Sequence, residues 1–118
     1  DPAFVRNCIS GVKTILEWFA DKVDKKTGML GAIPHWNFVD WPTQWPWSKD
    51  KPTGGVPPGG MTGGSSILTL QLAYTLKDAV ELLDHFGEKD LAAQYDSLRI
   101  SYVKIHGSIA GLKKNIVM

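Results

Sequence analysis

Aromatic and small polar residues alternate between residues 33 and 47, in the segment Ile-Pro-His-Trp-Asn-Phe-Val-Asp-Trp-Pro-Thr-Gln-Trp-Pro-Trp. Its four tryptophans are large apolar plates that each carry one hydrogen-bond donor. Sugar rings present C–H faces that stack on such plates, and short polar side chains between the plates can pair with sugar hydroxyls. We therefore expect a carbohydrate-binding surface formed by His35, Trp36, Asn37, Asp40, Trp41, Trp45 and Trp47, with Gln44 as a further polar partner.

Two alternatives accompany this interpretation. The tryptophans can instead form a miniature core for their own loop, since a long loop needs some packing to be ordered, and both roles can coexist. Asp40 stands between Val39 and Trp41. A carboxylate beside bulky rings is desolvated unless it is paired, which favours a functional role. The other interpretation is that Asp40 caps a turn near Pro42.

Other kinds of chemistry have weaker signals. His35, His85 and His106 lack metal-ligand spacing, so we expect no metal site and no cofactor. The glycine-rich stretch before residue 66 lacks the Gly-Lys-Ser/Thr core of a phosphate loop. The single cysteine, Cys8, excludes an internal disulfide, and its apolar neighbours predict a buried thiol.

The sequence also lacks a complete pair of carboxylic groups for the hydrolysis of a glycosidic bond. Glycoside hydrolysis usually needs two carboxylic groups flanking the bond, but only Asp40 and Asp50 lie between residues 29 and 64, the region that holds these tryptophans. Glu17, Glu81 and Glu88 lie in or beside predicted helices, where we expect them to be solvated. We therefore predict no catalytic residue in this chain.

The elements that position this segment are helical. Apolar residues recur at three- and four-residue steps from about Asp1 to Val23, which predicts a helix. Residues 29 to 64 hold six of the seven prolines, so they form a long loop. Ser65 and Ser66 can cap a helix that starts near Ile67 and stops at Gly87.

That second helix has two apolar faces, which implies more than one packing neighbour. Leu68, Leu72, Leu76, Val80 and Leu83 mark one face, and Ile67, Leu70 and Tyr74 mark the other. A short turn leads to a last helix, so the pair should form an antiparallel hairpin. Its apolar positions are Leu91, Tyr95, Leu98, Tyr102 and Ile105. After Gly107 the tail is only weakly periodic.

Length and composition fit one soluble all-α domain, residues 1–118, or a piece of a larger one. The formal net charge of +1 argues against a nucleic-acid binder, which needs a dense basic surface. The apolar runs are shorter than the ~20 residues of a membrane helix, so we expect no membrane partner. The first residues, Asp-Pro-Ala-Phe, resemble no signal sequence.

An ordered string of motifs resembles bacterial α-L-rhamnosidases, the family 78 glycoside hydrolases. The string consists of Trp36-Asn-Phe-Val-Asp-Trp41, Gly55-Val-Pro-Pro-Gly59, Gly64-Ser-Ser-Ile-Leu-Thr-Leu-Gln-Leu72, and Phe86-Gly87 followed by Ala92-Ala-Gln-Tyr95. It covers about residues 27 to 95, and it is specific as a combination rather than motif by motif. The tail from Ser101 departs from the expected run into a further hairpin.

The resemblance implies a six-hairpin (α/α)6 toroid, of which this chain would be a fragment, and inverting hydrolysis of terminal α-L-rhamnosides by the parent enzyme. It implies stacking roles for Trp36 and Trp41 and hydroxyl recognition for Asp40. The general acid and base of the family belong to stretches outside this sequence, so the fragment should be inactive alone. Periplasmic, secreted and cytoplasmic locations are all compatible with the family.

Two functions of other classes stay open: a non-catalytic carbohydrate-binding module, and a structural helical interaction domain whose tryptophans pack together. Helix faces left uncovered by a partial toroid favour association. We therefore expect a homodimer through those faces, or insolubility.

Overall fold

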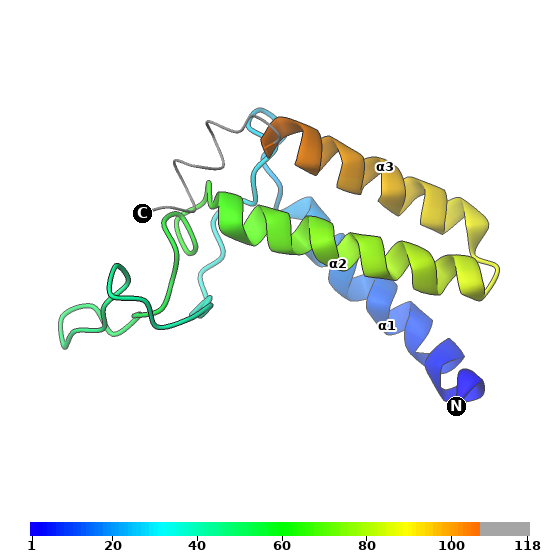
Figure 1. Ribbon diagram of the computed structural model, residues 1–118, viewed down its shortest axis with the longest axis horizontal. Helices are drawn as coiled ribbons and strands as arrows, with labels where there is room; N and C mark the ends of the chain where they lie inside the picture. The colour runs from blue at the N-terminus through cyan, green and yellow to red at the C-terminus, as the bar shows by residue number, and fades with distance from the viewer. Residues whose placement is uncertain (107–118) are drawn as a thin grey trace.

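The computed structural model describes residues 1–106, with side chains through Lys104, and folds them into three α-helices joined by one long loop (Figure 1). Helix α1 spans Pro2–Asp21, α2 spans Ser66–His85 and α3 spans Lys89–His106. No strand forms within these residues, where the only ladder contacts are isolated bridges of Leu30 with Val23 and with Ser65. The prediction of an all-α fold is confirmed for residues 1–106.

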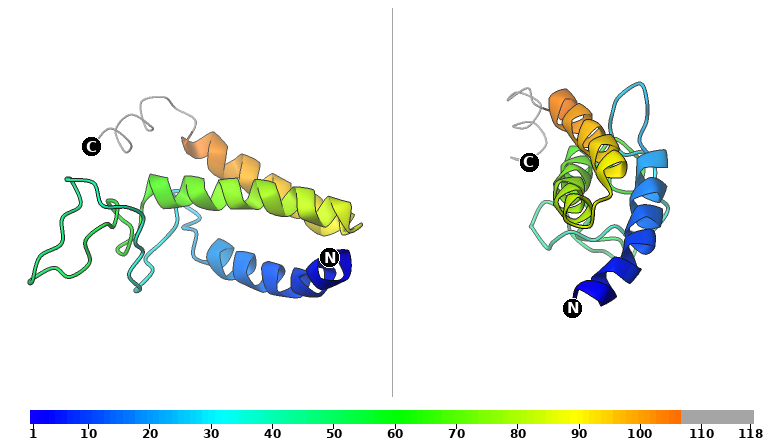
Figure 2. Two further views of the ribbon diagram at one scale, coloured as in Figure 1. Left: turned by 60° about the horizontal axis from the view of Figure 1, so that its bottom comes forward. Right: turned by 90° about the vertical axis from the view of Figure 1, so that its right-hand side faces the viewer.

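Helices α2 and α3 form the predicted antiparallel hairpin and lie side by side along most of their length (Figure 2). The Ser65 Oγ atom accepts a hydrogen bond from the Leu68 N–H at 3.2 Å, which caps the start of α2. Gly87 follows the end of α2 with φ +80°, a conformation that suits glycine at a helix C-terminus. Both helix-boundary predictions are therefore confirmed.

The core lies between the hairpin, the inner face of α1 and the start of the loop. Its most buried large side chains come from α2 and the loop, where Leu83, Leu76 and Ile33 are at most 2% exposed. The other buried apolar residues are Leu16, Leu30, Leu72, Ala73, Ala79, Ala92, Tyr95 and Tyr102. Burial of each large aliphatic side chain contributes roughly 1.5–3 kcal/mol to the stability of the fold. Because α2 supplies most of the buried helical residues, it is the central element of the core.

Helix α1 covers this core only in part. The Asp1 carboxylate caps its start by accepting the Ala3 N–H at 3.0 Å, and Pro2 occupies its first turn. The helix ends at Asp21, before Val23, which instead bridges to Leu30 in the loop. Leu16 is the one fully buried residue of α1, and most of the other residues of this helix are exposed.

The predicted burial of Cys8 is wrong, because its side chain is exposed. The core-facing residues of α1 are Ile9, Val12, Leu16 and Phe19. Each residue turns about 100° around an α-helix. Cys8 therefore lies on the flank of the core stripe although its neighbour in sequence, Ile9, is part of it.

The second apolar face of α2 is present but stays open within the described residues. Tyr74 is 67% exposed, and Ile67 and Leu70 are half-buried. In α3, Tyr95 and Tyr102 are buried and Leu91 and Leu98 half-buried, as predicted. The Ile105 side chain and the tail from Gly107 lie outside the described residues.

Candidate functional site

The long loop between α1 and α2 is fixed to the N-terminal end of α2. The Thr69 hydroxyl is fully buried; it accepts the Leu30 N–H at 2.8 Å and donates to the Ser65 carbonyl at 2.7 Å. At the other end of the loop, the Gly64 N–H donates to the Leu30 carbonyl at 2.9 Å. Both ends are therefore held together, and the middle of the loop projects beyond the helices (Figure 1).

Three aromatic rings meet in this projecting part. We call Trp36, Phe38 and Trp41 the aromatic cluster. The ring centroids of Phe38 and Trp41 are 4.9 Å apart, those of Trp36 and Phe38 are 6.0 Å apart, and those of Trp36 and Trp41 are 6.4 Å apart. The rings are tilted or edge-on to one another, which is the arrangement that aromatic quadrupoles favour. Each ring is thus held by two others.

The aromatic cluster remains open to solvent although its rings touch. Trp36 is 54% exposed, Phe38 44% and Trp41 58%. A miniature core would bury such rings, whereas these keep about half of their surface accessible. Exposed, mutually fixed plates of this kind are suited to stacking against the C–H face of a sugar ring.

Two consecutive glycines form the platform under the aromatic cluster. The Trp36 Nε1–H donates to the Gly54 carbonyl at 2.9 Å. Gly55 has φ +77°, and a Cβ atom there would stand 2.4 Å from two ring carbons of Phe38. Only glycine lets the backbone pass this close to the ring. The indole donor of Trp36 is used by the loop, so its contribution to a ligand is the face of the ring.

The predicted polar partners lie in different environments. The Asn37 Nδ2 atom donates to the Gly60 carbonyl at 2.7 Å, so this amide group ties the loop together. The Asp40 Oδ1 atom accepts the Trp41 N–H at 2.8 Å, and the residue is exposed. His35 is exposed beside Trp36. Asp40 therefore fixes the backbone before Trp41, and a carboxylate has enough acceptor sites to bind a sugar hydroxyl as well.

The other two tryptophans do not join the aromatic cluster in the described structure. Trp45 lines a separate cavity of about 340 Å³ inside the loop, together with Gln44, Lys51, Thr53 and the Pro57–Thr62 segment. The Trp47 backbone packs closely against Gly54, and its side chain is 55% exposed. Of the seven expected residues, two therefore belong to the aromatic cluster and one to this second cavity, whereas His35, Asn37, Asp40 and Trp47 belong to neither.

An apolar cavity of about 300 Å³ opens beside the aromatic cluster, between α1 and the start of α2. Phe38 belongs to both the cluster and this cavity. The remaining lining is mostly aliphatic, with Asn37, Gln71 and Thr75 as its polar members. This hollow reflects the loose packing of α1, and it extends the apolar surface around Phe38.

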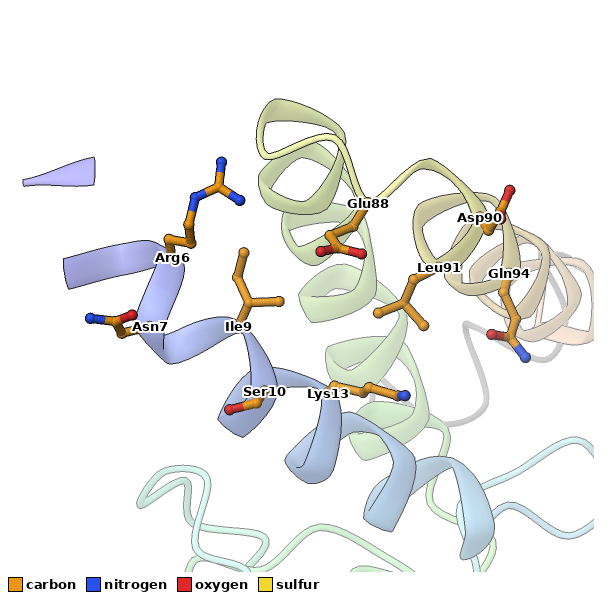
Figure 3. Close-up of a pocket in the computed structure, with 9 residues that line it drawn as sticks. All are labelled: Arg6, Asn7, Ile9, Ser10, Lys13, Glu88, Asp90, Leu91 and Gln94. Atoms are coloured by element: carbon orange, nitrogen blue, oxygen red, sulfur yellow. The ribbon is translucent and has the colours of Figure 1, made fainter. Parts of the chain in front are cut away.

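A groove of about 730 Å³ lies at the other end of the molecule, between α1 and the α2–α3 turn (Figure 3). Ile9 and Leu91 face each other there, surrounded by polar and charged side chains of both signs. The charged ones are Arg6, Lys13, Glu88 and Asp90. The groove is far from the aromatic cluster and has no convergent set of catalytic groups.

Among the side chains of residues 1–104, no three of His, Cys, Asp or Glu lie together as a metal site would require. No helix within residues 1–106 combines the length and apolarity that crossing a membrane demands. Asp40 and Asp50 are exposed, as are Glu17 and Glu81 on the helices and Glu88 in the turn between α2 and α3. The expected solvation of these three glutamates is confirmed.

Comparisons of the chain with protein-family models, with curated proteins and with solved structures find no match.

Sequence reasoning missed Phe38 as a member of the site. Its ring holds Trp36 and Trp41 together and rests on Gly55, which is 17 positions further along the chain. The available signal was the alternation of Trp36, Phe38 and Asp40 at two-residue steps, which is typical of extended backbone.

Proposed function

We propose that this chain carries the sugar-binding part of an α-L-rhamnosidase-like helical domain and binds L-rhamnose at the aromatic cluster. The single observation that carries the proposal is the open cluster of Trp36, Phe38 and Trp41. Stacking needs flat apolar faces that are accessible and held in place, and these rings have both properties.

The environment of the cluster supports a sugar rather than a purely apolar ligand. The exposed carboxylate of Asp40 and the imidazole of His35 lie next to the rings in sequence and carry hydrogen-bonding atoms. L-Rhamnose has a methyl group at C6, so one edge of its ring is apolar while the others carry hydroxyls. The apolar hollow beside Phe38 suits that edge.

The helical frame supports a place within a larger array of hairpins. Helices α2 and α3 form one antiparallel hairpin, and α1 lies beside it (Figure 2) with most of its residues exposed. An (α/α)6 toroid, which the motif string implies, is built from six such hairpins. In this proposal, the hairpin and α1 belong to neighbouring positions of the toroid, and the long loop points into its central pocket.

Hydrolysis by this chain alone is not part of the proposal. A hydrolytic pair needs one carboxylic group with a raised pKa and a second at a matched distance. The loop carboxylates Asp40 and Asp50 are both exposed. We expect binding of L-rhamnose without turnover of an aryl α-L-rhamnoside.

An intrinsic fluorescence titration with L-rhamnose and a panel of other monosaccharides tests the proposal. We expect a saturable change for L-rhamnose that is at least about tenfold weaker in Trp41→Ala, because about 1.4 kcal/mol of lost stacking corresponds to tenfold in affinity. Trp47→Ala is the matched control, since Trp47 is equally exposed but stands outside the aromatic cluster. It should bind like the wild type.

Three outcomes would contradict parts of the proposal. An equal loss of L-rhamnose affinity in Trp41→Ala and Trp47→Ala would place the binding site elsewhere on the loop. Full protection of all indoles from quenchers would favour a purely structural domain. Turnover of the aryl α-L-rhamnoside that disappears in Asp40→Asn would disprove the expected inactivity of this chain.

A further inference from the structure

One flank of α1 carries an uncovered row of apolar and small residues. Its large members are well exposed: Phe4 at 68%, Ile15 at 59% and Trp18 at 41%. Cys8 and Gly11 lie between them and are exposed as well. We call these five residues the outer seam. It runs beside the core-facing stripe of Ile9, Val12, Leu16 and Phe19, and Ile15 also lines the edge of the apolar cavity beside Phe38.

The spacing of the outer seam is that of a helix-packing surface. Its members follow one another at steps of four, three, four and three residues. This alternation keeps side chains in line along a partner helix, as in coiled coils. At Gly11, a Cβ atom would meet nothing within 4 Å. The centre of the outer seam therefore carries no side chain, so the backbone of a second helix can approach it closely.

We infer that the outer seam binds the outer seam of a second copy of this chain, with the two α1 helices antiparallel and crossing at Gly11. A two-fold interface requires a surface that is complementary to itself. Phe4 lies seven residues before Gly11 and Trp18 lies seven residues after it. Turning one helix around places Phe4 against Trp18 of the second copy at both ends.

Charge favours the antiparallel direction. Asp1 lies three residues before Phe4, and Lys22 lies four residues after Trp18, with its ammonium group 5.0 Å from the centroid of the Trp18 ring. Antiparallel pairing sets the carboxylate of Asp1 near the ammonium group of Lys22 in the second copy. Parallel pairing would set like charges together, which is unfavourable. The net charge of +1 adds little general repulsion between two copies.

Disulfide trapping tests the orientation. Antiparallel pairing brings Cys8 opposite Ile15 of the second copy, so the Ile15→Cys variant should form a covalent dimer under mild oxidation. The two thiols cannot pair within one chain, because seven helical residues separate them by about 10 Å. Wild-type protein should stay uncross-linked, because antiparallel pairing offsets its two Cys8 thiols along the helix axis.

A matched cysteine on the opposite flank is the control. Ser10→Cys adds an exposed thiol at the edge of the groove between α1 and the α2–α3 turn, and it should yield no covalent dimer with Cys8. Rapid cross-linking of wild-type Cys8 to itself would overturn the antiparallel direction. Equal cross-linking of Ile15→Cys and Ser10→Cys would show random collision and overturn the interface.

Sedimentation equilibrium tests the association itself. We expect wild-type protein to sediment at twice the chain mass, and Gly11→Glu to dimerise at least about 100-fold more weakly, because it buries a carboxylate at the crossing point. Gly11→Glu does not disturb the monomer, since its side chain enters open space. Ser10→Glu should remain dimeric. A monomeric wild type at high concentration, or a dimeric Gly11→Glu, would overturn the inference.

Discussion

At the scale of single residues, Gly55 decides whether the aromatic cluster forms. A methyl group at this position would overlap the Phe38 ring and stand 2.8 Å from the Asp40 carbonyl. We expect Gly55→Ala to lose L-rhamnose binding by at least about tenfold, the equivalent of about 1.4 kcal/mol. The fluorescence titration measures this loss, together with a shift in the emission of the unliganded protein.

The Gly64→Ala variant is a control that separates the effect of a collision with the Phe38 ring from the effect of backbone strain. Gly64 also has a positive φ, +85°, but a Cβ atom there would meet nothing within 4 Å. Both variants should lose about 1–2 kcal/mol of stability from the left-handed conformation. Only Gly55→Ala should lose sugar binding. Wild-type affinity in Gly55→Ala would show that the position of Phe38 does not matter.

At the scale of elements, the loop depends on one buried hydroxyl of α2. Replacing it in Thr69→Val leaves the Leu30 N–H without its acceptor. An unsatisfied buried donor costs about 1–3 kcal/mol, which urea unfolding should measure as a lower free energy of unfolding.

Thr75→Val is the control on the same helix, since Thr75 is exposed and donates only to the Gln71 carbonyl. It should stay within about 0.5 kcal/mol of the wild type. Equal effects of both variants would mean that Thr69 does not anchor the loop.

The elements also show how far the sequence could predict this structure. The boundaries of α2 were predictable because Ser65 and Gly87 act on their own neighbours. The position of Cys8 was not, because both flanks of α1 carry apolar residues and only tertiary packing selects the stripe that faces the core. Within the loop, the sequence pointed to Trp36 and Trp41. It could not reveal that Gly54 and Gly55 support them, because those contacts join segments far apart in the chain.

At the scale of the whole molecule, two buried phenols make folding sensitive to alkaline pH. Burial raises the pKa of Tyr95, with a smaller contribution from the negative charge of Glu17, and burial also raises the pKa of Tyr102. Above the ordinary value of 10.0, the unfolded chain releases these protons before the folded chain does. The folded state then binds more protons, so the free energy of unfolding falls as pH rises. The stabilisation is complete below that value and is lost as pH rises through the raised pKa values.

Urea midpoints measured from about pH 8 to pH 11 check this expectation. Tyr102→Phe should reduce the alkaline loss of stability. Tyr74→Phe should not change it, because Tyr74 is 67% exposed. A flat profile in the wild type, or equal effects of the two variants, would contradict the role of the buried phenols.

The most direct test of sugar binding at the aromatic cluster is a heteronuclear NMR titration of the indole N–H signals with L-rhamnose. Five tryptophans give five signals, which single substitutions assign. The signals of Trp36 and Trp41 should shift together along one saturation curve, while that of Trp18 on α1 should stay in place. Unchanged Trp36 and Trp41 signals at saturating L-rhamnose, or shifts confined to Trp18, would contradict the proposed sugar site.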